Sequence, residues 1–146
     1  MKHIYIDTNM MMNVVFKRVP DTHPSVALLR RCQQGHFSAY TSEWCIMTLM
    51  YMMDQLRDEH HKRVWSKQDI MKQTGKLLAF VTLVNGGNGT FAGAFAMEWP
   101  DWEDAIIYAV ADAHPLIECI VTDDAKFIRR AKRLQGVKVV APDEVI

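Results

Sequence analysis

The sequence predicts an α/β protein whose parallel sheet is covered by helices on both faces. Short apolar runs, typical of buried strands, alternate along the chain with segments whose apolar residues recur at helical spacing. Strands joined by crossover helices form parallel sheets, and the helices bury both faces of such a sheet. The clearest helix follows Pro100, where an unbroken i, i+3, i+4 series comprises Trp102, Ala105, Ile106, Ala109, Val110 and Ala113.

Three elements are expected in the first quarter of the chain. His3–Ile6 is a short apolar run that ends at an aspartate, which predicts a buried strand. A helix is expected over Met10–Phe16, and Pro20 breaks it. A second helix is expected over Ser25–Gln34, because Gly35 is a typical C-terminal stop.

The middle of the chain predicts two strands and two helices. Phe37–Tyr40 is the first of these strands, and Ser42 is a suitable N-cap for the helix that follows it. The apolar residues of that helix repeat at helical spacing and are Ile46, Leu49, Met50 and Met53. Asp69–Phe80 is expected to be helical, and Val81–Val84 is an apolar strand candidate.

The last third begins with the only glycine-rich segment, Asn85–Thr90, which reads NGGNGT. It lacks the lysine of a P-loop and the spacing of a dinucleotide fingerprint, so we expect a turn or a mobile loop there. After the helix that follows Pro100, Cys119–Val121 predicts a strand, Lys126–Arg133 a helix and Val137–Val140 a last strand.

Length and composition indicate one soluble domain spanning residues 1–146. The 17 basic and 17 acidic residues cancel, so no overall field attracts nucleic acid or membrane. The longest apolar stretch, residues 44–53, is about half the length of a membrane span. The N-terminus does not resemble a signal peptide. We therefore expect a cytoplasmic protein with no membrane segment.

The three cysteines, Cys32, Cys45 and Cys119, are widely spaced and form no Cys-x-x-Cys pair. Their odd number and spacing indicate neither a zinc site nor a disulfide framework. We expect free, mostly buried thiols, as is usual in a reducing cytoplasm.

Three acids occupy positions where ligands gather in open α/β sheets, beyond the carboxyl ends of the strands. Asp7 follows the first strand, Asp124 lies in the turn after Val121, and Asp104 lies in the first turn of the helix after Pro100. Carboxylates that converge there would suit a hard divalent cation such as Mg²⁺ or Mn²⁺.

Each acid also has a purely structural alternative. Asp7 and Asp124 each precede a helix and would serve as its N-cap. Asp101 fits the N-cap of the late helix, with Asp104 three residues on as the reciprocal partner of a capping box. Taken singly, these positions do not distinguish a metal site from helix capping.

Four segments in order resemble the successive blocks of a PIN domain, and the resemblance covers nearly the whole chain. They are IYIDTN at Ile4–Asn9, PDWEDAIIYAVA at Pro100–Ala111, IVTDDAKF at Ile120–Phe127 and VVAPDEVI at the C-terminus. The sequence is most similar to VapC-like toxin ribonucleases, in a subgroup with a DFEDA-like block.

The resemblance implies a three-layer α/β/α fold with a five-stranded parallel sheet and a metal-dependent endoribonuclease activity. It further implies Mg²⁺ or Mn²⁺ as cofactor, a role as the toxin of a toxin–antitoxin pair, and a homodimer. Asp7, Asp104 and Asp124 match the family's acids, which hold the metal and carry the catalysis. Asn9 and Thr122 match polar residues beside the metal.

One position departs from the family pattern. PIN domains usually carry a glutamate in the third helix, and here that place falls on Thr48. Asp101, Glu43 and Glu103 are substitutes for the lost carboxylate, with Glu103 preferred because it borders the acidic turn. The alternative is a catalytically inactive PIN module that binds RNA or protein. A phospho-acceptor receiver-like domain is less well supported, because its acidic pair at the first strand is missing.

Two surface features suggest partners despite the zero net charge. Basic residues crowd the helix after the third acid, and Lys126, Arg129 and Arg130 are candidates for binding the RNA backbone. The 10 methionines include residues 10–12 and four between Met47 and Met53. Core filling explains most of them. The more specific hypothesis is that some form an adaptable surface that binds an antitoxin segment or a second subunit.

Overall fold

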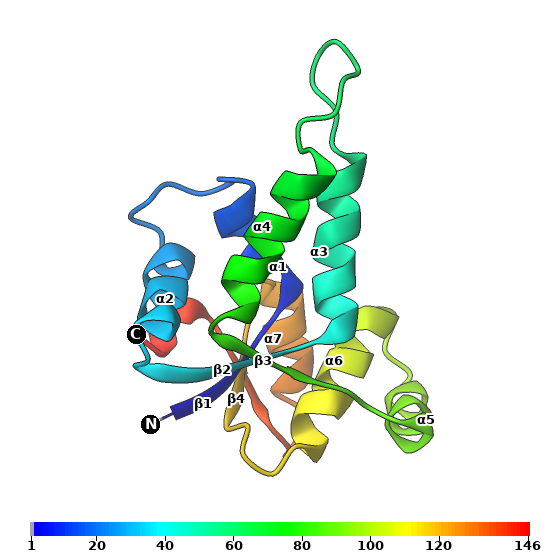
Figure 1. Cartoon of the computed structure of the whole chain (residues 1–146). Coiled ribbons are helices and arrows are strands. Elements are labelled where there is room, and N and C mark those ends of the chain that lie inside the picture. The colour runs from blue at the N-terminus through cyan, green and yellow to red at the C-terminus, as the bar shows by residue number, and fades with distance from the viewer. Residues whose placement is uncertain (1) are drawn as a thin grey trace.

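A single parallel sheet of five strands forms the centre of the computed structural model, which describes residues 2–146 (Figure 1). The strand order is β3-β2-β1-β4-β5, and every neighbouring pair is parallel. The strands are β1 (Lys2–Ile6), β2 (Phe37–Ser42), β3 (Val81–Val84), β4 (Cys119–Val121) and β5 (Lys138–Val140). The predicted α/β class and five-stranded parallel sheet are therefore confirmed.

Seven α-helices connect these strands, and a short 3₁₀ turn at Pro142–Glu144 follows the last one. The helices are α1 (Thr8–Val15), α2 (Pro24–Gln33), α3 (Glu43–Gln55), α4 (Lys67–Leu78), α5 (Asn88–Ala96), α6 (Trp102–Ala113) and α7 (Ala125–Ala131). Within the described residues, none of them is long and apolar enough to cross a membrane.

The strand order explains the three layers. From β1 the chain steps outward to β2 and β3, then returns to the other side of β1 for β4 and β5. Because parallel crossovers are right-handed, this reversal places helices α1 to α4 on one face of the sheet and α5 to α7 on the other. Figure 1 shows the two helical groups, with the α3–α4 connection projecting from the body.

The core lies on both faces of the sheet, because β1 is its central strand. Ile4, Tyr5 and Ile6 of β1 are fully buried. Helices from both layers complete the core with Met10, Met11, Leu28, Leu49, Met53, Ile107 and Phe127. Cys32, Cys45 and Cys119 are free and buried, as expected.

Two sequence-based expectations are wrong. Asn85–Thr90 is not simply a loop, because α5 begins at Asn88 inside it and continues to Ala96. Glycine weakens helices, but packing against α6 overrides local propensity here, and Ala94 is buried at that contact. Likewise, Met10–Met12 offer no docking surface, because all three side chains are buried in the core.

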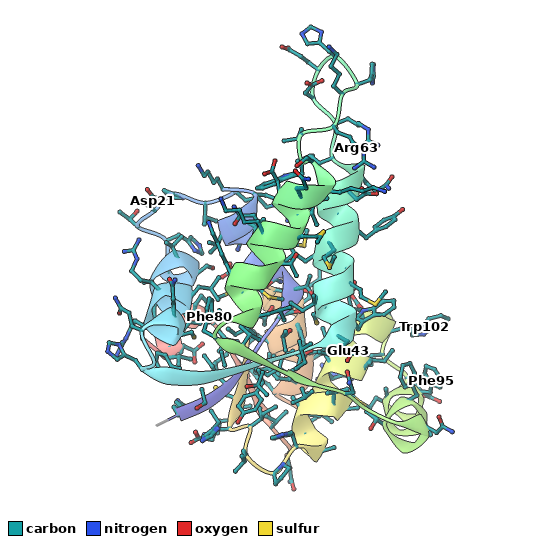
Figure 2. All side chains as sticks on the ribbon, viewed as in Figure 1. Asp21, Glu43, Arg63, Phe80, Phe95 and Trp102 are labelled. Atoms are coloured by element: carbon teal, nitrogen blue, oxygen red, sulfur yellow. The ribbon has the colours of Figure 1, made fainter. Side chains whose placement is uncertain are left out.

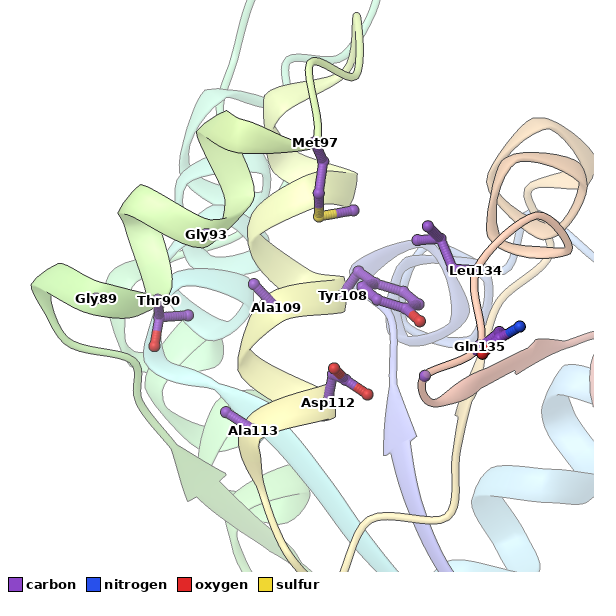
Figure 3. Close-up of a pocket in the computed structure, with 11 residues that line it drawn as sticks. Gly89, Thr90, Gly93, Met97, Tyr108, Ala109, Asp112, Ala113, Leu134 and Gln135 are labelled. Carbon is purple, nitrogen blue, oxygen red and sulfur yellow. The ribbon is translucent and has the colours of Figure 1, made fainter.

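A groove of about 500 Å³ lies between α5, α6 and the turn before β5 (Figure 3). Tyr108 and Asp112 of α6 point into it, toward the turn that carries Gly136. The Asp112 carboxylate accepts a hydrogen bond from the backbone N–H of Val137 at 2.8 Å. Gly136 is therefore packed directly against α6.

We expect Gly136→Ala to destabilise the protein by about 1–3 kcal/mol, because a methyl group there would collide with the Tyr108 hydroxyl and the Asp112 carboxylate. Gly93→Ala in α5 is the matched control, since no atom lies within 4 Å of the added carbon. In a helix that change should stabilise by about 0.5–1 kcal/mol. Urea unfolding measures both, and equal midpoints for the two variants would contradict the packing.

Candidate active site

The site begins where the two central strands end. Asp7 directly follows β1, and its backbone N–H donates to the carbonyl of Val121 in β4 at 3.1 Å. The chain leaves β1 toward one helical layer and leaves β4 toward the other, so strands β1 and β4 flank the topological switch point of the sheet. In open α/β sheets, this crevice is where ligands bind.

The Asp7 carboxylate is buried and held at both oxygens. Oδ1 accepts from the backbone N–H of Thr8 at 2.7 Å, which caps α1, and Oδ2 accepts from the Thr122 hydroxyl at 2.7 Å. Thr122 is fully buried, and its hydroxyl accepts from the Asn9 amide at 3.1 Å and from the Asp124 N–H at 3.1 Å. One threonine thus joins the first acid to the turn that carries the third.

Asp104 comes from the first turn of α6 and is also buried. Its Oδ2 has no hydrogen-bond partner in the described part of the chain. The nearest cation is the Arg130 guanidinium, whose Nη1 lies 3.6 Å from this oxygen, too far for a hydrogen bond. A buried carboxylate oxygen without a hydrogen bond is costly for the fold and is available to a ligand.

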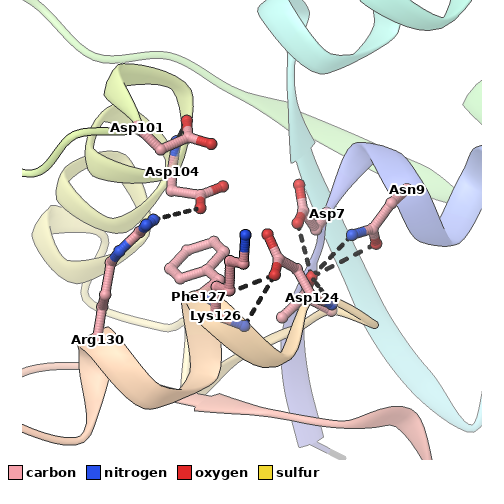
Figure 4. A network of polar contacts seen from close by, with 9 residues as sticks. Asp7, Asn9, Asp101, Asp104, Asp124, Lys126, Phe127 and Arg130 are labelled. Carbon is pink, nitrogen blue, oxygen red and sulfur yellow. Dashed lines mark hydrogen bonds and ion pairs between the residues drawn. The ribbon is translucent and has the colours of Figure 1, made fainter.

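The remaining acids lie around these two (Figure 4). Asp124 caps α7, since its carboxylate accepts from the backbone N–H of Lys126 at 2.9 Å. Asp101 caps α6 by accepting from the backbone N–H of Asp104 at 3.1 Å. The capping roles expected for Asp7, Asp101 and Asp124 are therefore real, and they are compatible with convergence on one site.

Crowding of acids in a buried place raises their pKa values. Burial raises the pKa of Asp7 to about 6, against the hydrogen bonds from Thr122 and Thr8, and the Glu103 and Asp124 carboxylates raise it further. Burial also raises the pKa of Asp104 to about 7, with the carboxylates of Asp101, Asp7 and Asp124 adding to the effect and Arg130 opposing it.

Glu103 belongs to the same cluster. Burial first and Asp101 second raise its pKa, while Thr8 and the Trp44 indole oppose the shift. Its charge acts in turn on Asp7. Thr48, at the position of the family glutamate, is half-buried on α3, and no hydrogen bond joins it to Asp7, Asp104 or Asp124 within residues 2–146.

The donor set fits a hard divalent cation. All the groups are carboxylate oxygens, one of them buried without a hydrogen bond, and a cation would relieve their mutual repulsion. Across the described residues, no three acidic, His or Cys side chains are close enough to hold a metal unaided. Binding would therefore need small movements of these side chains or water ligands, as is usual for Mg²⁺.

Lys126, Arg129 and Arg130 lie on α7, directly after Asp124. Arg130 lies near the Asp104 carboxylate, and it lines a groove together with Arg129. Sequence reasoning missed Asp123. Its carboxylate accepts from the Ser25 hydroxyl at 2.9 Å and from the Asn13 amide, and so ties α1 and α2 to the turn after β4. No sequence motif indicated this contact, because the three residues are far apart in the chain.

Comparisons with known proteins identify the family and agree with the fold. Residues 3–126 match the sequence model of the PIN domain. The crystal structure of VapBC2 from Rickettsia felis bound to a promoter DNA fragment superposes with a TM-score of 0.68 at 14% identity, covering 95% of this chain and 98% of that one. The structure of FitAB bound to an IR36 DNA fragment gives 0.64 at 18% identity, covering 95% and 94%. No curated protein sequence matches this chain.

The raised pKa values predict how stability depends on pH in a metal-free chain. Between the unfolded pKa near 4 and the folded values of about 6 and 7, the folded state holds more protons, so stability falls as pH rises through this window. Asp104→Asn removes one ionising group. In EDTA, its stability relative to that of the native chain should rise by about 1–3 kcal/mol between pH 5 and pH 8.

Thermal unfolding at pH 5 and pH 8 in EDTA tests this expectation. Asp143→Asn, an exposed acid in the C-terminal 3₁₀ turn, is the control and should follow the native chain at both values. A constant difference between Asp104→Asn and the native chain across this range would show that Asp104 does not titrate there.

Proposed function

The chain belongs to the PIN domain family, and we propose that it is a divalent-metal-dependent endoribonuclease, the toxin of a toxin–antitoxin pair. PIN domains are generally metal-dependent nucleases, and two of the structures similar to this chain are those of VapBC2 and FitAB. We further propose that it acts in the cytoplasm, where its three buried thiols would stay reduced.

The observation that carries this proposal is the meeting of Asp7, Asp104 and Asp124 at the switch point of the sheet. They are widely separated in sequence, and the charges of Asp7 and Asp124 raise the pKa of Asp104, while the charge of Asp124 raises that of Asp7. In addition, the buried Oδ2 of Asp104 has no hydrogen bond within the described residues and is therefore free to bind a cation. Helix capping alone would not require the three to face one another (Figure 4).

We assign the metal to Asp7, Asp104 and Asp124, with Mg²⁺ or Mn²⁺ as the ion. A bound cation of this kind supplies an activated water for in-line attack on a phosphodiester and offsets charge on the phosphate and the leaving oxygen. The protein's part is to keep the carboxylates ionised and oriented. Ionisation is needed because a protonated acid would bind a cation weakly.

Thr122 and Asn9 are the positioning residues. The Thr122 hydroxyl donates to Asp7, while the Asn9 amide donates to Thr122, so the hydrogen bonds run in one direction toward the carboxylate. Such outer contacts fix the orientation of metal ligands and favour their ionised form. Arg130 is the resident counter-charge beside Asp104 and lies where a substrate phosphate would approach.

Glu103 is our choice for the carboxylate that replaces the family glutamate at Thr48. It lies in the first turn of α6, beside Asp104, and interacts electrostatically with Asp7. Glu43 is exposed at the start of α3, and Asp101 is engaged as the α6 cap, so neither is as well placed.

A protein partner would find an exposed aromatic surface next to the acids. This surface comprises Trp44 and Met47 of α3, Phe91 and Phe95 of α5, and Trp102 of α6. The rings of Phe95 and Trp102 are 6.5 Å apart (Figure 2). The Trp44 indole lies beside Glu103. We propose that an antitoxin covers this surface, since large exposed apolar areas usually mark interaction sites and cover here would also close off the acids.

A second apolar surface lies between α3 and α4, in a groove of about 320 Å³ lined by Met50, Tyr51, Ile70 and Met71. Met71 and Tyr51 are more than 60% exposed. We propose that this groove forms the contact between two copies of the chain. It retains part of the methionine-rich hypothesis, because Met50 lines it.

The nuclease proposal predicts metal-dependent cleavage of a mixed RNA pool that is lost in Asp7→Asn and in Asp104→Asn. Changes beside metal ligands commonly cost 10–100-fold, so loss of a ligand should cost at least about 100-fold. In the same variants, the rise in melting temperature that Mn²⁺ produces in the native chain should disappear.

Asp143→Asn is the control and should cleave RNA and respond to Mn²⁺ as the native chain does. Glu103→Gln tests whether Glu103 replaces the family glutamate. It should reduce the rise in melting temperature that Mn²⁺ produces, whereas Glu43→Gln should not. A native chain that neither cleaves RNA nor gains stability from Mn²⁺ would favour the inactive binding module, with Thr48 as its cause.

The dimer proposal predicts that the native chain is a dimer in sedimentation equilibrium and that the Met71→Lys variant is shifted toward monomer. The substitution places a charge in the apolar groove. Met47→Lys is the matched control, since Met47 is equally exposed at 67% but belongs to the aromatic surface. Equal shifts in both variants, or a native chain that is already monomeric, would contradict the assignment.

A further inference from the structure

A groove of about 510 Å³ that includes Arg130 in its lining lies between α7 and the segment before α6. Its lining comprises Trp99, Pro100, Arg129, Arg130, Arg133 and Leu134. Three arginine side chains therefore line one space, largely with their apolar stems, and no carboxylate of the described chain lines it. The groove attracts anions although the net charge of the protein is zero.

The arginines are not explained by ion pairs within the protein. Arg130 has one partner, Asp104, whereas Arg129 and Arg133 form no ion pair among residues 2–146. Basic residues at a helix C-terminus gain about 0.3–1 kcal/mol from the helix dipole. That gain would apply equally to Lys132, so it does not explain why three arginines share one groove.

Arg130 connects this groove to the acids. Its guanidinium lies 3.6 Å from Asp104 Oδ2 and also lines the groove. A nucleic-acid strand with one phosphate at the carboxylates would therefore pass Arg130 and place its neighbouring phosphate between Arg129 and Arg133. Planar guanidinium groups suit this role because they bind phosphate oxygens in pairs.

Trp99 supplies an aromatic wall. Its indole is half-buried and packs against Phe127, with ring centroids 5.9 Å apart, and against Tyr108 at 5.6 Å. These contacts hold the ring in place before any ligand binds, while part of it stays open in the groove. Proteins that bind single strands combine such rings with cationic grooves, and each stacked base contributes about 1–3 kcal/mol.

We propose that this groove binds the nucleotide next to the cleaved bond in single-stranded RNA, with Arg129 and Arg133 on its phosphate and Trp99 stacked on its base. The proposal rests on the nuclease function and deepens it. It selects unpaired RNA, because a base inside a duplex has no free face for the indole. Lys126, which does not line the groove, is left without a part in this subsite.

Fluorescence anisotropy of a labelled single-stranded RNA in EDTA tests the proposal without cleavage. Arg129→Ala/Arg133→Ala should lower affinity at least about 10-fold and reduce the slope of log K against log salt by about 0.7, the value for one phosphate contact. Lys132→Ala is the matched control. It removes a charge from the same helix end but faces a different groove, so less than a 2-fold change is expected.

Trp99→Phe tests the stacking with a smaller disturbance of the packing. RNA should quench tryptophan fluorescence in the native chain, and the quenching should be smaller in the variant, which keeps the other three tryptophans, while its melting temperature stays close to native. The native chain should also prefer the single strand to a duplex of the same sequence. Affinity changes equal to those of Lys132→Ala, no binding by the native chain, or equal binding of duplex would overturn the proposal.

The outcome is separable from that of the nuclease function. Binding that depends on Arg129 and Arg133, in a chain that never cleaves RNA with Mn²⁺, would keep the subsite and reject the nuclease. Metal-dependent cleavage with native affinity in the double variant would keep the nuclease and reject the subsite.

Discussion

The hydrogen bond from the Thr122 hydroxyl to Asp7 is the contact on which the site depends. It spans the switch point between β1 and β4, where the backbone N–H of Asp7 also donates to Val121. Because parallel strands end at the same edge of a sheet, the pairing of β1 with β4 brings together residues that are 115 positions apart. Without that pairing, Asp7 and Asp124 would be ordinary helix caps.

The cost of this arrangement is electrostatic. Two buried carboxylates with raised pKa values, a third at the start of α7 and Glu103 beside them repel one another in the absence of a cation. Arg130 offsets part of this repulsion from a distance too long for a hydrogen bond. Proteins often keep such unfavourable clusters where function requires them, and the rest of the fold compensates. Here the compensation is a sheet whose central strand buries Ile4, Tyr5 and Ile6 fully between two helical layers.

Arg130 also links the two charged regions of the surface. Its guanidinium lies near the Asp104 carboxylate, and the same residue lines a groove with Arg129 and Arg133. The zero net charge conceals this separation, because it averages an acidic site with a basic groove. Net charge therefore describes neither region, since local fields act on a ligand within about 10 Å.

The sequence by itself determined the sheet and most of the helices. Strand patterns at Val81–Val84 and Cys119–Val121 were predicted with their observed bounds, and Ser42, Asp101 and Asp124 cap the helices expected to follow them. These features depend on local periodicity and on hydrogen bonds between near neighbours, which a sequence pattern records. The PIN resemblance added the order of the acids along the chain.

Only the tertiary structure decided what depends on contacts between distant segments. The glycine-rich start of α5 is helical because α6 packs against it, and Met10–Met12 are buried because two helical layers cover β1. The contact of Asp123 with Ser25, the missing hydrogen bond of Asp104 Oδ2 and the groove around Trp99 likewise involve residues that no spacing rule connects. Burial and long-range pairing are set by how the layers close, and a single sequence records that closure only indirectly.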